Sequence, residues 1–166
     1  SVGAEGTEVG RSAPTLWNVA FLQRFFWDGR ARSLEEQMQG PLYAAAEMGT
    51  TPEKLLQTLE SSAAYRELFG AAFPRDSGDA IALTQIYTAL AAFEASLISL
   101  GSRYDHYANG DPTALSAQEI EGFNVFRSFV ARCAECHTPP LFTNQQIAVI
   151  GVPDGEGRPF DPGAGA

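Results

Sequence analysis

The sequence predicts an all-α fold, mainly because it contains two capping boxes and one long amphipathic segment. Ser33-Leu34-Glu35-Glu36 and Ser116-Ala117-Gln118-Glu119 each place a serine three residues before a glutamate, a pattern typical of helix N-termini. Between 80 and 100, apolar residues recur at helical spacing. They are Leu83, Ile86, Tyr87, Leu90, Phe93 and Leu97. No strand is predicted anywhere in the chain.

The first third of the chain is predicted as loop followed by two short helices. Residues 1–13 are glycine-rich and polar, which indicates loop. Residues 16–26 are apolar on nearly every side, which predicts a short buried helix. The helix that begins after Ser33 is expected to end at Gly40-Pro41, because both residues interrupt helices.

Three further helices are predicted after residue 50. Thr51-Pro52-Glu53 supplies an N-cap, a proline at the first helical position and an early carboxylate, and Leu55, Leu56 and Leu59 mark one face. A short helix over 63–69 precedes the long one. The helix after Ser116 leads toward the cysteines, with an apolar face made of Ile120, Phe123, Phe126 and Val130. The turn sequence Asn109-Gly110-Asp111-Pro112 indicates a domain boundary.

Composition bounds the class of protein. The 166 residues suffice for one domain or parts of two, and 45% hydrophobic with 19% charged residues is typical of a soluble globular protein. The net charge of −9 argues against binding to nucleic acid or anionic lipid. No apolar run is long enough to cross a bilayer. Both ends read as loop, so we expect the chain to be a processed product, a fragment, or the ordered part of a longer protein.

Cys133-Ala134-Glu135-Cys136-His137 is the most informative motif. Two thiols three positions apart can each add to a vinyl group of one porphyrin, and the adjacent histidine can ligate its iron. A zinc site would need a fourth ligand, and the chain has no other cysteine and only His106 besides. A redox pair would need the strand-then-helix setting of a thioredoxin site, and the sequence before Cys133 does not have that pattern. The motif therefore predicts covalent haem c, with His137 as the metal ligand.

Several stretches together resemble the bacterial di-haem cytochrome c peroxidase family, which includes the MauG-like enzymes. The resemblance runs from about residue 11 to residue 145. It is carried by Arg11-Ser12-Ala13-Pro14-Thr15-Leu16-Trp17-Asn18, Phe26-Trp27-Asp28-Gly29-Arg30-Ala31, Gln37, Pro41, Glu47-Met48-Gly49 and the cysteine motif.

This resemblance implies cytochrome-c-like helical domains, each holding one haem c. Residues 1–108 would be the remainder of the N-terminal, peroxide-reacting domain, and residues 109–166 the start of the C-terminal, electron-transfer domain. Cys133, Cys136 and His137 would hold the electron-transfer haem, and the second haem is expected from the full-length protein.

The resemblance also implies roles for residues of the first part. Trp27 would lie between the haems and relay electrons, Glu47 would be the distal carboxylate of the peroxide-reacting haem, and Gln37 its polar companion. Splitting an O–O bond needs a group that takes a proton and returns it, which suits a carboxylate. Arg30 would pair with a haem propionate or with a carboxylate.

Each of these assignments has a simpler structural alternative. Trp27 would then be a core residue, and Glu47 and Gln37 solvated helix residues. The two methionines, Met38 and Met48, could in principle ligate iron, but core packing is the better interpretation for both. His106 lies in a polar turn, and we expect it to be exposed and not a ligand.

Four features depart from the family pattern. The haem motif of the peroxide-reacting domain is absent from the chain, and the sixth ligand of the His137 haem would lie beyond Ala166. Residues 1–13 contain no histidine, whereas peroxidases that need reductive activation carry a loop histidine at a place that falls near Ala4. Ser12 replaces an asparagine that helps bind calcium in many members, which makes calcium doubtful.

The sequence therefore predicts a periplasmic, peroxide-dependent di-haem oxidoreductase with a peroxidase-type activity. Its reductant would be a small electron-donor protein, a cytochrome c or a cupredoxin, or else the residues of a partner protein, as in MauG-like enzymes. The alternative is a mono-haem electron carrier without peroxidase activity. Haem c is generally attached outside the bacterial cytoplasm, which is the basis for the periplasmic assignment.

Overall fold

Helices and short 3-10 turns form the regular structure of the computed structural model, which describes residues 2–74, 80–148, 150–151, 153, 156–157 and 160–165. Over these residues the β contacts are two isolated antiparallel bridges, Val2 with Glu8 and Phe25 with Ala31. The all-α prediction is confirmed. No helix in the described ranges has both the length and the apolar character that a membrane span requires.

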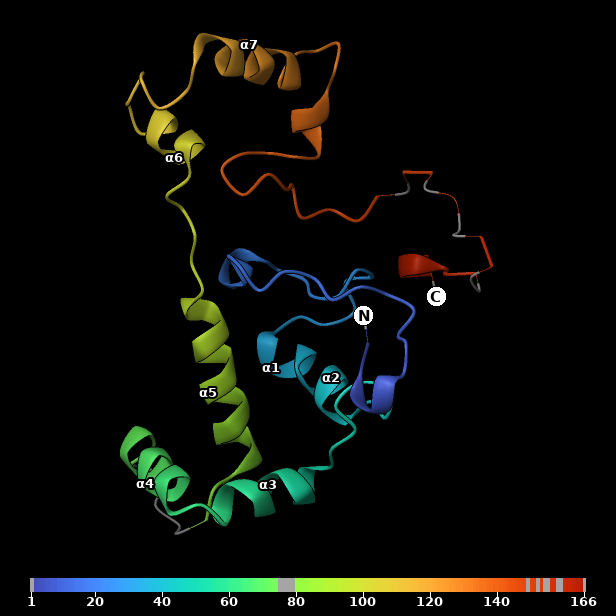
Figure 1. Ribbon diagram of the computed structural model, residues 1–166, viewed down its shortest axis with the longest axis vertical. Helices are drawn as coiled ribbons and strands as arrows, with labels where there is room; N and C mark the ends of the chain where they lie inside the picture. The colour runs from blue at the N-terminus through green and yellow to red at the C-terminus, as the bar shows by residue number, and fades with distance from the viewer. Residues whose placement is uncertain are drawn as a thin grey trace.

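Five helices form the lower part of the molecule in Figure 1. They are α1 (Leu34–Gln37), α2 (Gln39–Tyr43), α3 (Pro52–Glu60), α4 (Ala63–Ala72) and α5 (Leu83–Ser96). The short helix α1 packs against both α2 and α5, α3 packs against α4, and the 3-10 turn η2 (Val19–Phe21) contacts α5. Buried apolar side chains from η2, α1, α2 and α5, from the Phe25–Ala31 bridge and from the cap residue Met38 form the core: Val19, Phe25, Ala31, Leu34, Met38, Leu42 and Ala91.

A second group of helices lies at the other end of α5. It contains α6 (Arg103–Ala108), α7 (Ala117–Phe126) and the 3-10 turn η3 (Cys133–Glu135). Both carboxylate oxygens of Glu119 accept hydrogen bonds of 2.6 Å from the guanidinium of Arg103. These bonds lower the pKa of Glu119 to about 2. Edge and tilted contacts join the rings of Tyr104, Phe123, Phe126 and Phe142. Polar and aromatic contacts thus hold α6 to α7.

The predicted helix caps are confirmed. The side chains of Ser33, Thr51 and Ser116 each accept a hydrogen bond from the backbone N–H three residues later, at 3.1, 3.2 and 3.3 Å. Glu119 completes the capping box at Ser116, whereas Glu36 instead accepts from the N–H of Arg32. These bonds satisfy N–H groups that the first turn of a helix leaves unpaired.

Replacing Thr51 with alanine should lower the free energy of unfolding by about 1 kcal/mol, because the N–H of Lys54 loses its partner. Thr58 lies in the same helix and donates its hydroxyl hydrogen to the carbonyl of Lys54. Thr58→Ala should be neutral or stabilising, since alanine has the higher helix propensity. Urea unfolding of the two variants would check this. Equal midpoints would contradict the capping role.

The predicted helix over 16–26 is wrong. Only Val19–Phe21 forms a 3-10 turn, and Asn18 and Phe26 have positive φ values of 62° and 67°. The side chain of Asn18 is bonded to both the carbonyl and the N–H of Ser99, at 2.9 and 2.7 Å. This long-range contact, rather than local propensity, sets the backbone here. Trp17 and Phe21 are exposed.

Other boundaries also differ from the prediction. Gly40-Pro41 does not end the helix that begins after Ser33, because α1 already ends at Gln37 and both residues lie inside the next helix, α2. Proline is tolerated there since it sits in the first turn, where its missing N–H would have no partner within the helix. Helix α7 ends at Phe126, so Val130 is not part of its face and is exposed. His106 is exposed as predicted, but it lies in α6 rather than in a turn.

The buried face of α5 is rotated from the predicted one. Gln85, Ile86 and Ala91 are buried, whereas Leu90 and Phe93 are exposed. The small side chain of Ala91 belongs to the core where α1 packs on α5, and a close helix contact favours small residues there. Helix α4 extends to Ala72, three residues beyond the predicted end.

Candidate functional site

The cysteine motif forms a tight turn after α7. The N–H of His137 donates to the carbonyl of Cys133 at 2.9 Å, and the N–H of Cys136 donates to the same carbonyl at 3.3 Å. Cys133 is half-buried and Cys136 exposed, and both thiols are free. The turn thus leaves two thiols available for thioether formation.

The imidazole of His137 is held by a backbone carbonyl. Its Nδ1 atom lies 3.2 Å from the carbonyl oxygen of Phe142. Because a carbonyl can only accept, Nδ1 carries the hydrogen of this bond. Nε2 then remains available to a metal, in the arrangement usual for metal-bound histidines.

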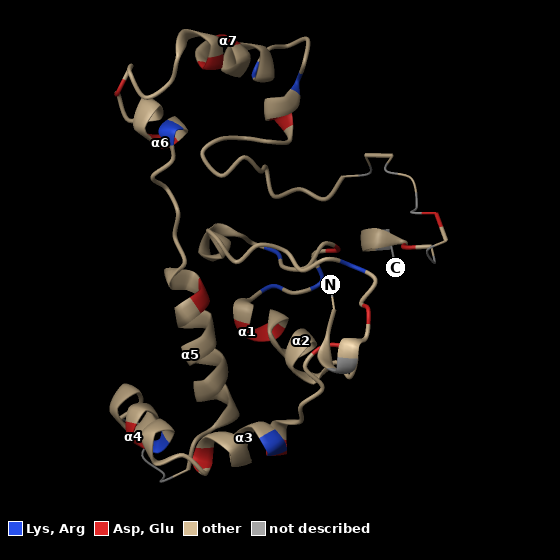
Figure 2. Cartoon of the chain, in the orientation of Figure 1, with Lys and Arg blue, Asp and Glu red and all other residues tan. Residues whose placement is uncertain are grey.

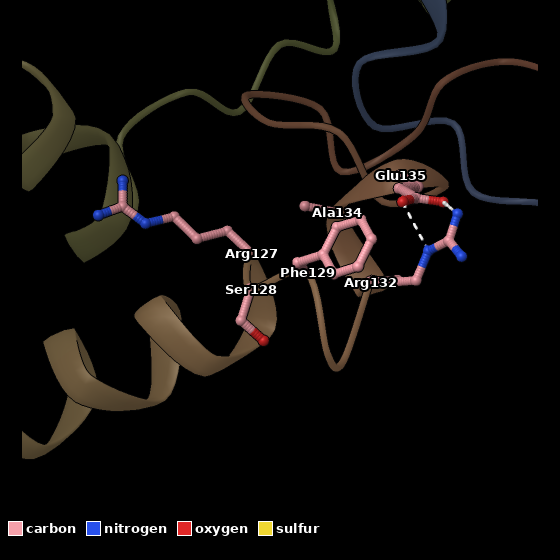
Figure 3. Close-up of a pocket in the computed structure, with 6 residues that line it drawn as sticks. All are labelled: Arg127, Ser128, Phe129, Arg132, Ala134 and Glu135. Atoms are coloured by element: carbon pink, nitrogen blue, oxygen red, sulfur yellow. Dashed lines mark hydrogen bonds and ion pairs between the residues drawn. The ribbon is translucent and has the colours of Figure 1, made fainter.

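Exposed apolar side chains precede this motif in the sequence. Phe129 is 86% exposed, and Val125 and Val130 are also exposed. A shallow hollow of about 300 Å³, lined by Phe129 together with Arg127, Ser128, Arg132, Ala134 and Glu135, lies beside the motif (Figure 3). In Figure 3 the ring of Phe129 lies near the ion pair of Arg132 with Glu135, and Arg127 points away from that pair. Free thiols, an oriented imidazole and uncovered apolar groups fit a covalently attached haem.

The N-terminal loop contacts the backbone at Glu47. The N–H of Ala4 donates to the carbonyl of Glu47 at 2.6 Å. Gly3 approaches so closely that a Cβ atom there would lie 1.9 Å from the carbonyl oxygen of Ala46, so only glycine fits. The carboxylate of Glu47 is half-buried and forms no hydrogen bond or ion pair with the part of the chain that the structure describes.

Gln37 is the last residue of α1, and Glu47 lies in the turn that follows α2. The side chain of Gln37 is half-buried and forms no hydrogen bond to the described residues, Glu47 included. A hydrogen bond of 2.5 Å between the hydroxyls of Tyr43 and Tyr87 fastens α2 to α5. Burial, together with this bond, raises the pKa of Tyr43 to about 12. The prediction for Met38 is confirmed at 3% exposure, whereas Met48 is 63% exposed and not a core residue.

Trp27 is not a core residue, because 64% of it is exposed. Its Nε1–H donates to the carbonyl of Ser12 at 2.7 Å, which fixes one edge of the indole. It lies in a loop closed by the bridge between Phe25 and Ala31. The neighbouring Gly29 has a φ of +66°, a conformation that favours glycine.

Arg11 connects three distant parts of the chain and was not identified as a functional residue from sequence. It forms ion pairs with Asp28, at 2.6 Å, and with Asp161. The pKa of Arg11 is raised by these bonds, and that of Asp161 is lowered to about 2 by the bond from Arg11. Burial alone would raise the pKa of Asp28, but bonds from Arg11 and Arg30 lower it.

Arg30 pairs with a carboxylate of the protein itself. Its Nη1 atom donates to Asp28 at 2.7 Å, and its Cζ atom lies 3.4 Å from the centre of the Phe26 ring. The side chain remains 55% exposed. The irregular stretch from Arg24 to Arg32 carries several arginines, whereas α1 beside it carries only acidic charges (Figure 2).

The predicted site residues form two groups that are not in direct contact. One group is Trp27, Arg30, Gln37 and Glu47, and the other is Cys133, Cys136 and His137. A segment that follows the cysteine motif, residues 142–147, lies between them. Gln145 in this segment bonds to the backbone of Phe21 and of Gln23. An open groove of about 690 Å³ runs along the junction. It is lined by Gln23, Arg24, Thr138, Thr143, Asn144, Gln145, Gln146 and Ile147.

Comparison with known proteins identifies the family. A family profile described as di-haem cytochrome c peroxidase matches residues 1–113, which is more than half of the chain. The chain belongs to the di-haem cytochrome c peroxidase family. The matched range contains Trp27, Gln37 and Glu47. Haem c is the cofactor that membership of this family implies.

Individual members of the family are similar over nearly all of the chain. The cytochrome c551 peroxidase of Nitrosomonas europaea is 35% identical over 152 residues, covering 92% of this chain and 44% of that protein. The methylamine utilization protein MauG of Methylophilus methylotrophus is 38% identical over 151 residues, covering 90% and 44%. A solved MauG-like protein associated with microbial copper homeostasis superposes with a TM-score of 0.76 at 32% identity, covering 82% of this chain and 40% of that one. The chain thus spans less than half the length of these di-haem relatives.

Proposed function

We propose that the chain is part of a periplasmic di-haem oxidoreductase that reduces hydrogen peroxide at one haem and passes electrons through the other. The observation that carries this proposal is the state of Glu47, a half-buried carboxylate without a partner among the described residues. Family membership supports a peroxidase-type activity.

Cys133, Cys136 and His137 would hold the electron-transfer haem in this proposal. When bound, haem supplies the iron that accepts or releases single electrons. The residues of this chain attach it, orient it and select one imidazole nitrogen as ligand, since Nδ1 is already bonded to the carbonyl of Phe142. Haem c attachment also supports a location outside the cytoplasm.

Glu47 would act as the acid–base group for peroxide. A carboxylate free of ion pairs can take the proton from one peroxide oxygen and give it to the departing one. Its backbone is fixed by the N–H of Ala4, so the side chain starts from a defined position. Gln37 would orient peroxide by hydrogen bonding without adding charge.

Trp27 would relay electrons between the two centres. Its exposure and its single hydrogen bond to Ser12 leave the indole face open for contact with a group outside the described residues. We propose that Arg30 contacts a haem propionate in addition to Asp28, because only one of its guanidinium nitrogens is engaged by that carboxylate.

The position of Ala4 supports the MauG-like branch. Peroxidases that need reductive activation carry a histidine near this place, and here the backbone of Ala4 lies against Glu47 instead. The peroxide site would then be ready without reductive activation. The electrons would come from a small donor protein, a cytochrome c or cupredoxin, or from side chains of a partner protein.

We further propose that the boundary between the two domains lies before α6, at 100–102, slightly earlier than the predicted division after residue 108. Support comes from the contacts of Arg103 and Tyr104, which are made with residues of the second part of the chain.

Assays on the full-length protein would test the function. Rapid peroxide-dependent oxidation of reduced cytochrome c would support a donor-dependent peroxidase. Absence of that turnover, together with oxidation of a protein partner, would support the MauG-like activity. Measurement of one haem per polypeptide by the pyridine haemochrome method would instead support the mono-haem carrier, and would overturn the proposal.

A further inference from the structure

We propose that Gln145 is a positioning residue that fixes the segment after His137 onto the loop that carries Trp27. The inference rests on the proposed function, because it assigns Gln145 a part in electron transfer between the two centres. It concerns a residue outside both predicted groups of site residues.

The amide of Gln145 makes two hydrogen bonds to backbone far away in sequence. Its Nε2–H donates to the carbonyl of Phe21 at 2.9 Å, and its Oε1 accepts from the N–H of Gln23 at 2.8 Å. Both polar ends of the side chain are therefore satisfied by the same short stretch. Such a two-point contact fixes orientation as well as distance.

On one side, this contact leads directly to the haem motif. The segment that contains Gln145 begins at Phe142, whose carbonyl accepts the bond from the imidazole of His137. The next residue but one, Asn144, donates its backbone N–H to the carbonyl of Cys136 and its side-chain amide to that of Glu135, at 2.8 and 2.9 Å. A displacement of this segment would therefore change the position of the His137 imidazole, the proposed iron ligand.

On the other side, the contact leads to the loop of Trp27. Phe21 and Gln23 immediately precede the bridge between Phe25 and Ala31 that closes this loop. Ile147 packs against Gly29 within the loop, where a Cβ atom would lie only 2.6 Å from the Ile147 Cδ1 atom. A residue larger than glycine would force the end of the Ile147 side chain to move.

The backbone of the segment is held in an unfavourable conformation. Phe142 and Gln145 have φ values of 55° and 57°, in the left-handed region that side chains with a Cβ rarely adopt. Such conformations persist where the surrounding contacts determine them, and they are enriched at functional sites. The hydrogen bond from the N–H of Gln145 to the hydroxyl of Thr143, at 3.0 Å, helps to hold this one.

Gln145→Ala and Gln146→Ala, made in the full-length holoprotein, form a matched pair. The side chain of Gln146 is exposed and forms no hydrogen bond to the residues described. Hydrogen–deuterium exchange at the Gln23 amide should become about tenfold faster in Gln145→Ala, because this amide loses its acceptor. Oxidation of the His137 haem after mixing with peroxide, followed by stopped-flow absorbance, should become about fivefold slower. Gln146→Ala should change neither quantity.

Unchanged exchange at Gln23 in Gln145→Ala would show that the contact does not hold the two segments together, and would overturn the inference. Faster exchange with an unchanged electron-transfer rate would overturn the positioning role. Should the wild-type protein show no peroxide-driven oxidation of the His137 haem while exchange rises as expected, the proposed function is wrong and the structural part of the inference stands.

Discussion

Replacing Glu47 with glutamine should slow the reaction of the full-length protein with hydrogen peroxide by about 10² to 10⁴-fold, the range typical of a lost acid–base group. Glutamine has nearly the same size and can still form hydrogen bonds, but it cannot exchange a proton. The backbone bond from Ala4 to the carbonyl of residue 47 does not depend on the side chain, so the loop should stay in place. The rate is measured by stopped-flow absorbance after mixing with peroxide.

Glu67→Gln is the matched control for this variant. Glu67 lies on α4, is exposed, and its side chain forms no hydrogen bond or ion pair with the residues that the structure describes. Its replacement removes the same charge without touching the candidate site. In both variants the absorbance spectrum of the His137 haem should equal that of the wild type. Normal peroxide kinetics in Glu47→Gln would remove this carboxylate from the mechanism.

Helix starts could be predicted because the interactions that form them are local. Ser33, Thr51 and Ser116 each reach an N–H group three residues away, so the motif contains both partners of the bond. The same holds for the cysteine motif, whose turn is closed by the bond from His137 to Cys133.

Buried faces could not be predicted equally well, because burial depends on distant partners. Phe93 is larger and more apolar than Ala91, yet Ala91 belongs to the core and Phe93 is exposed. The reason is that α1 contacts the small-residue side of α5. Likewise, the apolar stretch over 16–26 does not form a helix, since Asn18 is tied to Ser99.

In the candidate site, too, residues with a local sequence signal could be predicted, whereas residues that depend on distant contacts could not. Glu47, Gln37 and Trp27 were identified by motif spacing within a family, which requires no knowledge of the three-dimensional contacts. Arg11 and Gln145 act through partners 150 and about 120 residues away. Nothing near Gln145 in sequence predicts that its amide bonds to Phe21 and Gln23. The local sign for Arg11 is its place as the first residue of the motif Arg11-Ser12-Ala13-Pro14.

Replacing Trp27 with phenylalanine should slow electron transfer to the His137 haem about a hundredfold, equivalent to ~2.7 kcal/mol of barrier. Phenylalanine is harder to oxidise than tryptophan and cannot donate a hydrogen bond to the carbonyl of Ser12, so it loses both the relay and its fixed orientation. Trp17→Phe is the control, because Trp17 is exposed to nearly the same extent, 60% against 64%. Stopped-flow absorbance separates the first reaction with peroxide, which should be unchanged in both variants, from the later oxidation of the His137 haem. If the two variants slow this later step equally, electron transfer does not depend on the indole of Trp27, and its exposed position must be explained by a contact with another part of the protein.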